Sequence, residues 1–340
     1  MRASLENWLL RTWYGSQRPP WFLRSLEPVY RSLFQYVQKR GHTSSKRYRS
    51  RLPLVVVGNL TAGGSGKTPL VIHLCKLAME LNLRPGIAST GYGRPGTDTI
   101  EVNAVSDARI CGDEPVMLAI RTGVPVVVAK NRIDAIRELD GMELDLIFSD
   151  DGLQKADMER DIEICVIDGV RGFGNGRLLP AGPLREPVSR LNTVDHVVTN
   201  GVWANRPDDV DVAVMQLDAR QLNSLDSSME LPATDFLQRQ KGKELHAIAG
   251  IGNPQRFFDT LEDLGIEAAP HHFPDHHRFS RRDFDFMTTD SVVIMTEKDA
   301  VKCRAFGLDN AWYLPLETHL PAEFESMFRN RMAKLIEERT

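Results

Sequence analysis

Hydrophobic residues in the middle of the chain form short runs that alternate with longer segments of mixed polarity. The short runs are rich in Val, Ile and Leu, which predicts strands buried on both faces of a parallel sheet. The longer segments repeat apolar residues at steps of three and four, which predicts helices. Together they predict an α/β fold with helices on both faces of the sheet. Strands are expected at 54–57, 86–89, 125–129, 145–149, 162–168 and 196–199, and helices at 67–83, 114–121 and 132–139.

The pattern changes twice beyond residue 205. Residues 206–243 are richer in Pro, Asp, Ser and Gln and lose their periodicity, so we expect a connecting ribbon or linker there. A second series follows, with strands expected at 245–251, 292–295 and 312–316, and helices at 255–264 and 322–338. These changes divide the chain into an N-terminal basic helical segment (1–50), a first α/β domain (51–205), the ribbon (206–243) and a smaller α/β/α lobe with a closing helix (244–340).

The N-terminal segment combines aromatic residues with positive charge. Residues 1–52 hold eleven Lys and Arg residues against two Glu residues, whereas the whole chain has a net charge of −4. Apolar residues recur at helical spacing in this segment, at Phe22, Leu26, Val29, Leu33 and Val37. Such a helix either lies in a membrane interface, attracted to anionic lipid, or packs on the protein's own core, and we favour the interface. The acidic remainder of the chain argues against nucleic acid as a partner.

The composition of the chain indicates in which cellular compartment we expect it. It is 42% hydrophobic and 26% charged, which is typical of a globular domain, and no apolar run approaches the ~20 residues that a membrane-spanning helix needs. Charges interrupt the apolar residues at the N-terminus, so no signal peptide is expected. The four cysteines lie far apart, which favours reduced thiols. We therefore expect a peripheral protein at a cytoplasmic membrane face, with no transmembrane helix and no protein partner required.

A glycine-rich turn between the first strand and the first helix is typical of a phosphate-binding loop (P-loop). An apolar strand precedes it, and Lys67, Thr68 and Pro69 begin the helix. Backbone N–H groups and the helix dipole then point at an anion, Lys67 adds positive charge and the Thr68 hydroxyl can hold Mg²⁺. Thr61 replaces the first glycine of the usual pattern, and an ordinary strand–helix turn is the alternative. The residues expected to bind the phosphates of a nucleotide are Thr61, Ala62, Gly63, Gly64, Ser65, Gly66, Lys67 and Thr68.

Two acidic segments are candidates for the chemistry next to this loop. Asp150 and Asp151 follow an apolar strand, where Mg²⁺–nucleotide sites place carboxylates. We expect one of them to hold Mg²⁺ together with Thr68. Asp113 lies two residues before Pro115 and is either the N-cap of a helix or a catalytic acid. The local pattern by itself favours the cap.

Four histidines lie within residues 271–277. Their spacing fits no structural zinc pattern, and Mg²⁺ disfavours imidazole. His276 beside a carboxylate is a candidate proton acceptor, and a solvated loop is the alternative. Further on, Thr296-Glu-Lys-Asp299 is similar to the guanine-reading motif of GTPases. Its lysine lies one place late, so we infer no guanine specificity from it.

The glycine- and proline-rich loop at 174–187 follows the end of a predicted strand, where open α/β sheets bind ligands. Arg177 and Arg185 lie in this loop and are candidates for holding a phosphate-bearing substrate. Glu114 and Glu186 complete the set of candidate substrate-binding residues.

Taken together, these motifs resemble those of the tetraacyldisaccharide 4′-kinase family, the lipid A kinases of bacteria with a lipopolysaccharide outer membrane. The motifs occur in family order across nearly the whole chain. The matching segments are 55–69, Gly91-Tyr-Gly93, Gly112-Asp-Glu-Pro115, Asp150-Asp-Gly-Leu-Gln154, Arg160-Asp-Ile-Glu-Ile164, Phe173-Gly-Asn-Gly176, Pro180-Ala-Gly-Pro-Leu-Arg-Glu186, Ala249-Gly-Ile-Gly-Asn-Pro254, Asp275-His276 and Thr296-Glu-Lys-Asp-Ala-Val-Lys302.

The resemblance implies an ATP- and Mg²⁺-dependent kinase at the cytoplasmic face of the inner membrane. Its acceptor would be the 4′-hydroxyl of a tetraacylated glucosamine disaccharide 1-phosphate, the lipid A disaccharide. It also implies two α/β/α lobes joined by a ribbon. The aspartate of the Gly-Asp-Glu-Pro motif is the proposed base of the family, assisted by the histidine of the Asp-His motif. These residues are Asp113 and His276 here.

The chain departs from the family pattern at two positions. Thr90 stands where many relatives have arginine, and Lys155 where many have histidine, so no ligand contact is assigned to either. Two other classes of function remain open from the sequence. A GTPase-like switch or chaperone would share the phosphate loop, and so would a soluble small-molecule kinase, although the basic N-terminal helix counts against the latter.

Overall fold

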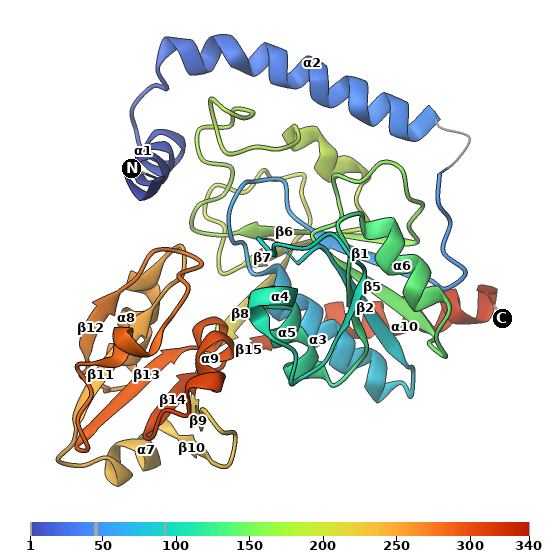
Figure 1. Ribbon diagram of the computed structural model, residues 1–340. Coiled ribbons are helices and arrows are strands. Elements are labelled where there is room, and N and C mark those ends of the chain that lie inside the picture. The colour runs from blue at the N-terminus through green and yellow to red at the C-terminus, as the bar shows by residue number, and fades with distance from the viewer. Residues whose placement is uncertain (1, 44–46, 92, 340) are drawn as a thin grey trace.

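The computed structural model describes residues 2–43, 47–91 and 93–339, so Tyr92 of the Gly91-Tyr-Gly93 motif lies outside the described residues. Two twisted sheets form two lobes, and two N-terminal helices lie across one side of the larger lobe (Figure 1). The α/β class predicted from the sequence is confirmed. The four cysteines are free and buried, as expected for structural thiols.

The larger lobe is built on a nine-stranded sheet whose strands are parallel except at its two edges. In spatial order they are β15 (Glu317–His319), β8 (Ala213–Asp218), β7 (His196–Asn200), β6 (Ile162–Asp168), β1 (Leu54–Gly58), β5 (Leu146–Asp150), β2 (Pro85–Ser89), β4 (Val126–Val128) and β3 (Ile100–Val102). Every residue of β1, β2, β4 and β5 is buried, which explains why these strands are mostly apolar up to their carboxyl ends.

Helices cover both faces of this sheet. The helices α3 (Lys67–Glu80), α5 (Asp113–Thr122) and α10 (Ala322–Arg339) share one core with one face. The helix α6 (Arg132–Asp140) packs on the other face. The short helix α4 (Ala108–Cys111) precedes α5, and the 3₁₀ helix η1 (Val188–Thr193) precedes β7.

The smaller lobe is a six-stranded sheet with helices on both faces. In spatial order its strands are β10 (Glu230–Pro232), β9 (Gln221–Ser224), β14 (Ala311–Leu314), β13 (Ser291–Thr296), β11 (Glu244–Ala249) and β12 (Ala269–His272). The helices α7 (Ala233–Arg239) and α8 (Pro254–Asp263) cover one face, and α9 (Glu297–Cys303) the other. Two 3₁₀ helices, η2 (Arg281–Phe284) and η3 (Arg304–Phe306), complete the lobe.

The last part of the chain returns to the larger lobe, which corrects the expected boundaries. The ribbon predicted at 206–243 contains β8, which pairs with β7, and β9 and β10, which belong to the smaller sheet. From the expected second lobe, β15 pairs with β8, and α10 buries Phe324, Phe328 and Met332 in the same core as α3. Helical periodicity predicted α10 correctly, but periodicity does not tell which core a helix joins. The strands were missed because β8 is mostly half-exposed and β15 is only three residues long.

The N-terminal helices α1 (Arg2–Tyr14) and α2 (Trp21–Thr43) lie at the periphery of the molecule, with α2 running along one side of the larger lobe (Figure 1). Leu23 and Glu27 of α2 are buried, and the Tyr30 hydroxyl donates to the Arg185 carbonyl at 3.0 Å. The apolar residues that recur at helical spacing lie on the outward side and are 45–61% exposed: Phe22, Leu26, Val29, Leu33 and Val37. The apolar stripe read from the sequence therefore does not pack on the protein's own core. No helix among the described residues is long and apolar enough to cross a bilayer.

Candidate active site

The phosphate loop connects β1 to α3 and leaves the start of the helix open. Gly66 precedes α3 with a φ of +96°, and no side chain caps the helix. A Cβ on Gly66 would lie only 2.8 Å from Asn200 Nδ2, so both the backbone angle and the space require glycine. Gly63 also has a positive φ, and its carbonyl accepts a hydrogen bond from Asn59 Nδ2 at 3.1 Å. Uncapped N–H groups at a helix N-terminus are an anion site.

The first two residues of the predicted loop are tied to another segment. The Ala62 N–H donates to the Pro183 carbonyl at 2.8 Å, and Thr61 forms a β-bridge with Leu184. The N–H of Ala62 is therefore already used, and the part of the loop that can meet a phosphate narrows to 63–68. Ser65 lies in that part, and its buried hydroxyl has no partner among the described residues.

The two acids after β5 lie beside the loop because β5 is the neighbour of β1 in the sheet. Lys67 Nζ is 3.6 Å from Asp151 Oδ1, and Arg185 Nη1 donates to both carboxylate oxygens of Asp151 at 3.1–3.2 Å. Burial would raise the pKa of Asp151, but the positive charges of Lys67 and Arg185 outweigh it and lower the pKa. Buried Arg132 binds the backbone carbonyls of Asp150 and Asp151. The role of Arg132 was missed because nothing in its local pattern separates it from a surface helix residue.

Within the described residues, the side-chain carboxylate of Asp150 has no cationic group within hydrogen-bond distance, unlike that of Asp151. It is 4% exposed, and its Oδ1 has no hydrogen-bond partner among the described residues. Burial, together with the negative charge of Glu114, raises its pKa to about 7. A bound cation would supply the positive charge that this buried carboxylate needs in order to be ionised. Mg²⁺ suits such a place, because it takes most of its other ligands from water and phosphate.

Asp113 and His276 meet across the two lobes. Asp113 is the first residue of α5 and His276 lies in the loop after β12, yet their Oδ2 and Nδ1 atoms are 3.3 Å apart. The N-cap of α5 is Gly112, and no side chain caps it, so the capping alternative for Asp113 is not the arrangement found. His276 is held in the left-handed region, with a φ of +56°. The sequence paired these residues only through the family resemblance, because they lie 163 positions apart.

Two lysines of the Thr296–Lys302 motif complete this cluster. Lys298 Nζ lies 3.9 Å from Asp113 Oδ2, and Lys302 Nζ lies 3.8 Å from the same atom. Lys298 also binds Glu114 at 3.1 Å. Burial would raise the pKa of Asp113, but the hydrogen bond with His276 and the charges of Lys298 and Lys302 lower it to about 2. The sequence pointed to this motif through the guanine comparison and through the family resemblance, but neither showed that it lies beside Asp113.

Three of the candidate substrate residues lie apart from one another. Glu114 belongs to the Asp113 cluster, whereas Glu186 is buried and accepts a hydrogen bond from Gln154 Nε2 at 2.8 Å. Arg177 pairs with Glu27 of α2 at 2.9 Å. Arg185 lies near Glu186, because both side chains bond Gln154, whereas the contacts of Glu114 and Arg177 lie in other clusters.

Comparison with known proteins places this arrangement in a family. The profile of the family described as tetraacyldisaccharide-1-P 4′-kinase, LpxK, matches residues 19–333. The chain belongs to this kinase family. A tetraacyldisaccharide 4′-kinase of Methylobacillus flagellatus is 42% identical over 99% of both chains, and one of Hahella chejuensis is 43% identical over 96% of this chain and 97% of its own. A crystal structure of LpxK from Aquifex aeolicus, described as in complex with ATP, is 27% identical and has a TM-score of 0.78, covering 92% of this chain and 99% of that one.

Membership confirms the family and the kinase class inferred from the sequence motifs, and nothing in the comparisons favours the switch or the small-molecule kinase. We expect the acidic limb of the pH profile of this kinase to depend on His276. The hydrogen bond with Asp113 raises the pKa of His276 above its ordinary value of 6.5, against burial and the charge of Lys298. Below that raised pKa His276 is protonated, so it can no longer share the proton that Asp113 takes from the hydroxyl. We expect kcat/KM to fall as the pH drops through a pKa above 6.5.

The variant Lys298→Met tests whether this lysine sets that limb. Lys298 lowers the pKa of both Asp113 and His276, so its removal should raise them and move the acidic limb to higher pH. The matched control is Lys76→Met, because Lys76 lies on α3 and pairs with Glu317. A Lys298→Met profile that is lowered evenly at every pH, without a shift, would mean that Lys298 only supports the structure.

Proposed function

We propose that this kinase transfers the γ-phosphate of ATP to the 4′-hydroxyl of a tetraacylated glucosamine disaccharide 1-phosphate. The observation that carries the proposal is the electrostatic link between the phosphate loop and the cluster around Asp113. The charge of Glu114 raises the pKa of Asp150 beside the phosphate loop, and the same Glu114 follows Asp113 in α5 and binds Lys298 of the Asp113 cluster at 3.1 Å. A hydroxyl acceptor and a nucleotide can therefore meet between the two lobes.

In this proposal the loop N–H groups at 63–66 and Lys67 hold the β- and γ-phosphates. Thr68 and Asp150 are the residues that fit Mg²⁺, because Asp151 is already engaged by Lys67 and Arg185. A bound Mg²⁺ would neutralise charge that develops on the phosphate oxygens. The positions of Lys67 and Arg185 around Asp151 also limit how far either cation can move, which favours a fixed phosphate geometry.

The proton of the sugar hydroxyl is the other requirement of the reaction. Asp113 accepts it as the oxygen attacks, and His276 orients the carboxylate and shares the proton. The two residues come from different lobes, so the pair exists only while the lobes are in contact. Arg121 of α5 supports that contact by binding Glu297 of α9 at 2.9–3.0 Å.

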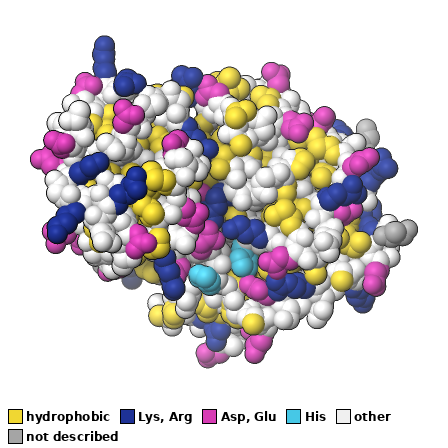
Figure 2. Space-filling model, turned by 90° about the horizontal axis from the view of Figure 1, so that it is seen from below, with side chains coloured by type: hydrophobic (Ala, Val, Ile, Leu, Met, Phe, Trp, Pro, Cys, Tyr) yellow, Lys and Arg dark blue, Asp and Glu magenta, His cyan; other side chains and the backbone are white. Residues whose placement is uncertain are grey.

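The kinase would meet such a lipid acceptor at a membrane surface. The outward side of α2 exposes apolar residues, while Arg24 and Arg31 lie on the same helix and are exposed, which is the composition of an interfacial helix. Elsewhere the surface differs: on the face seen in Figure 2, basic and acidic side chains are intermixed. We propose that α2 rests on anionic lipid at the cytoplasmic face of the inner membrane, as a peripheral contact.

Substitution on the outward side of α2 tests this contact. Leu33, which is 61% exposed, and Val29 should lose binding to anionic vesicles when both are replaced by Asp, because the apolar area no longer enters the interface. Vesicle sedimentation measures the loss. The control replaces Val105, which is 91% exposed in the larger lobe, by Asp. Equal sedimentation of both variants with the unmodified protein would count against a membrane role for α2.

ADP release measured with and without the acceptor lipid tests the proposed function. A kinase should bind ATP more tightly than GTP and release ADP mainly when the disaccharide lipid is present. A GTPase-like switch should instead prefer GTP and hydrolyse it without this lipid. Preference for GTP with no response to the lipid would refute the proposal.

A further inference from the structure

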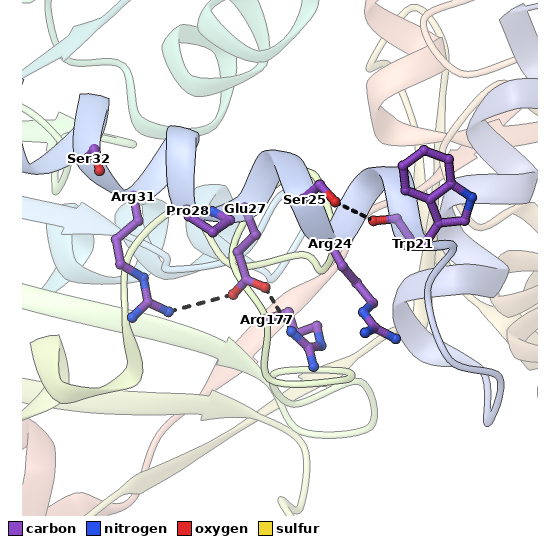
Figure 3. Close-up of a pocket in the computed structure, with 8 residues that line it drawn as sticks. All are labelled: Trp21, Arg24, Ser25, Glu27, Pro28, Arg31, Ser32 and Arg177. Atoms are coloured by element: carbon purple, nitrogen blue, oxygen red, sulfur yellow. Dashed lines mark hydrogen bonds and ion pairs between the residues drawn. The ribbon is translucent and has the colours of Figure 1, made fainter.

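A groove lined by arginines lies between α2 and the loop at 174–187 (Figure 3). It consists of two adjoining cavities of about 330 and 600 Å³, and Arg24 and Arg177 line both. Arg18 lines the smaller cavity, and Arg31 the larger one. Figure 3 shows Arg24, Arg31 and Arg177 on one side of α2, with Glu27 between them.

The groove carries more positive charge than its own acid can neutralise. Glu27 is buried and pairs with Arg177 at 2.9 Å and with Arg31 at 3.6 Å. It holds Arg177 further by accepting the backbone N–H of Leu178 at 3.2 Å. Arg24 and Arg18 are exposed, and neither has an ion pair within the described part of the chain. The groove therefore combines a fixed arginine with two free ones, an arrangement suited to a phosphate.

The groove is also close to the phosphate loop. The Leu184 N–H donates to the Arg177 carbonyl at 3.1 Å, and Leu184 forms a β-bridge with Thr61 at the start of the loop. Leu184 is therefore the one residue that links the backbone of Arg177 to that of Thr61 in these contacts. On its other side the groove adjoins α2, whose outward residues are apolar. A ligand that enters here can thus reach from the lipid-facing helix toward the nucleotide.

We propose that this arginine groove binds the anomeric phosphate of the acceptor disaccharide, the end opposite to the hydroxyl that receives the new phosphate. The inference rests on the proposed function. The groove would hold a phosphate monoester at the membrane surface and set the register of the disaccharide against Asp113. A headgroup of an anionic phospholipid carries similar chemistry, but it has no second end to place near Asp113.

Two acceptor lipids separate these sources of phosphate: the tetraacylated disaccharide with its anomeric phosphate, and the same lipid without it. Both are presented in zwitterionic phosphatidylcholine, so that no bulk anionic lipid competes. Arg24→Ala should lower kcat/KM for the phosphorylated acceptor by roughly tenfold or more, as expected for a lost charged hydrogen bond. For the acceptor without the phosphate it should change kcat/KM little. Arg40→Ala, which removes a charge from α2 outside the groove, is the matched control and should not distinguish the two acceptors.

Binding of the two lipids without ATP gives a readout that does not depend on turnover. Arg24→Ala should weaken binding of the phosphorylated lipid alone. If the unmodified protein transfers no phosphate to either lipid but Arg24 still distinguishes them in binding, the proposed function fails and the groove stands. Equal losses of binding for both lipids would assign the groove to the phospholipid surface and overturn the inference. The same conclusion would follow if Arg24→Ala differed from the unmodified protein only with phosphatidylglycerol vesicles. No effect on either lipid would overturn it as well.

Discussion

Replacing Asp113 by Asn should lower kcat by about 10²- to 10⁴-fold, while the variant folds normally and binds ATP. The loss is expected because the amide cannot accept the proton of the sugar hydroxyl. Folding should survive, since the Asp113 side chain is not the cap of α5 and the oxygen that accepts the Glu114 N–H at 3.0 Å is retained in Asn. Single-turnover transfer of radiolabelled phosphate measures the chemical step directly.

The partner residue provides the control for this assignment. His276→Ala should also be impaired, and the double variant should be little worse than the worse single variant, as for residues that act as a unit. Effects that multiply would show that Asp113 and His276 act separately. Full activity in a stable Asp113→Asn protein would leave Asp113 with a structural role only.

Replacing Lys67 by Ala should lower turnover by about 10²- to 10³-fold, because the phosphate loop loses the positive charge that meets the transferring phosphate. Lys67 is the cation at the start of α3 and lies 3.6 Å from Asp151. ATP affinity and kcat should both fall. Lys76→Ala is the control, because it removes a lysine from the same helix two and a half turns away from the loop.

The result for Lys67 is also informative about Asp151. Without Lys67, Asp151 keeps Arg185 and Arg132 as nearby cations but loses one of the charges that lower its pKa, so its pKa should rise. Near-normal activity of Lys67→Ala, with Lys76→Ala equally active, would contradict the assignment of the nucleotide site to this loop.

The strands and the phosphate loop could be predicted because their signals are local. The run at 54–57 is apolar and unbroken, and the turn that follows has glycine where the backbone needs a positive φ, at Gly63 and Gly66. The closeness of Asp150 to the loop could be predicted in the same way. The parallel strands β1 and β5 have their carboxyl ends at the same edge of the sheet, so the loop after β1 and Asp150 at the end of β5 lie near each other.

The rest depended on contacts between distant segments. The strands β8 and β15 pair across a hundred residues, and α10 joins the core of the larger lobe, although no local pattern records either contact. Lys298 and Lys302 reach Asp113 for the same reason. The helix α2 shows both cases. Its apolar stripe is a local pattern and could be predicted, whereas nothing in the sequence indicates that Glu27 faces the protein.

The most direct test of the account locates the phosphate that the protein transfers. The full-length protein is incubated with γ-labelled ATP, Mg²⁺ and the tetraacylated disaccharide 1-phosphate, and the product is analysed for the position of the label. The account predicts label on the 4′-oxygen of the disaccharide, and almost none with Asp113→Asn. Label that appears only as inorganic phosphate, or at any other hydroxyl of the lipid, would contradict it.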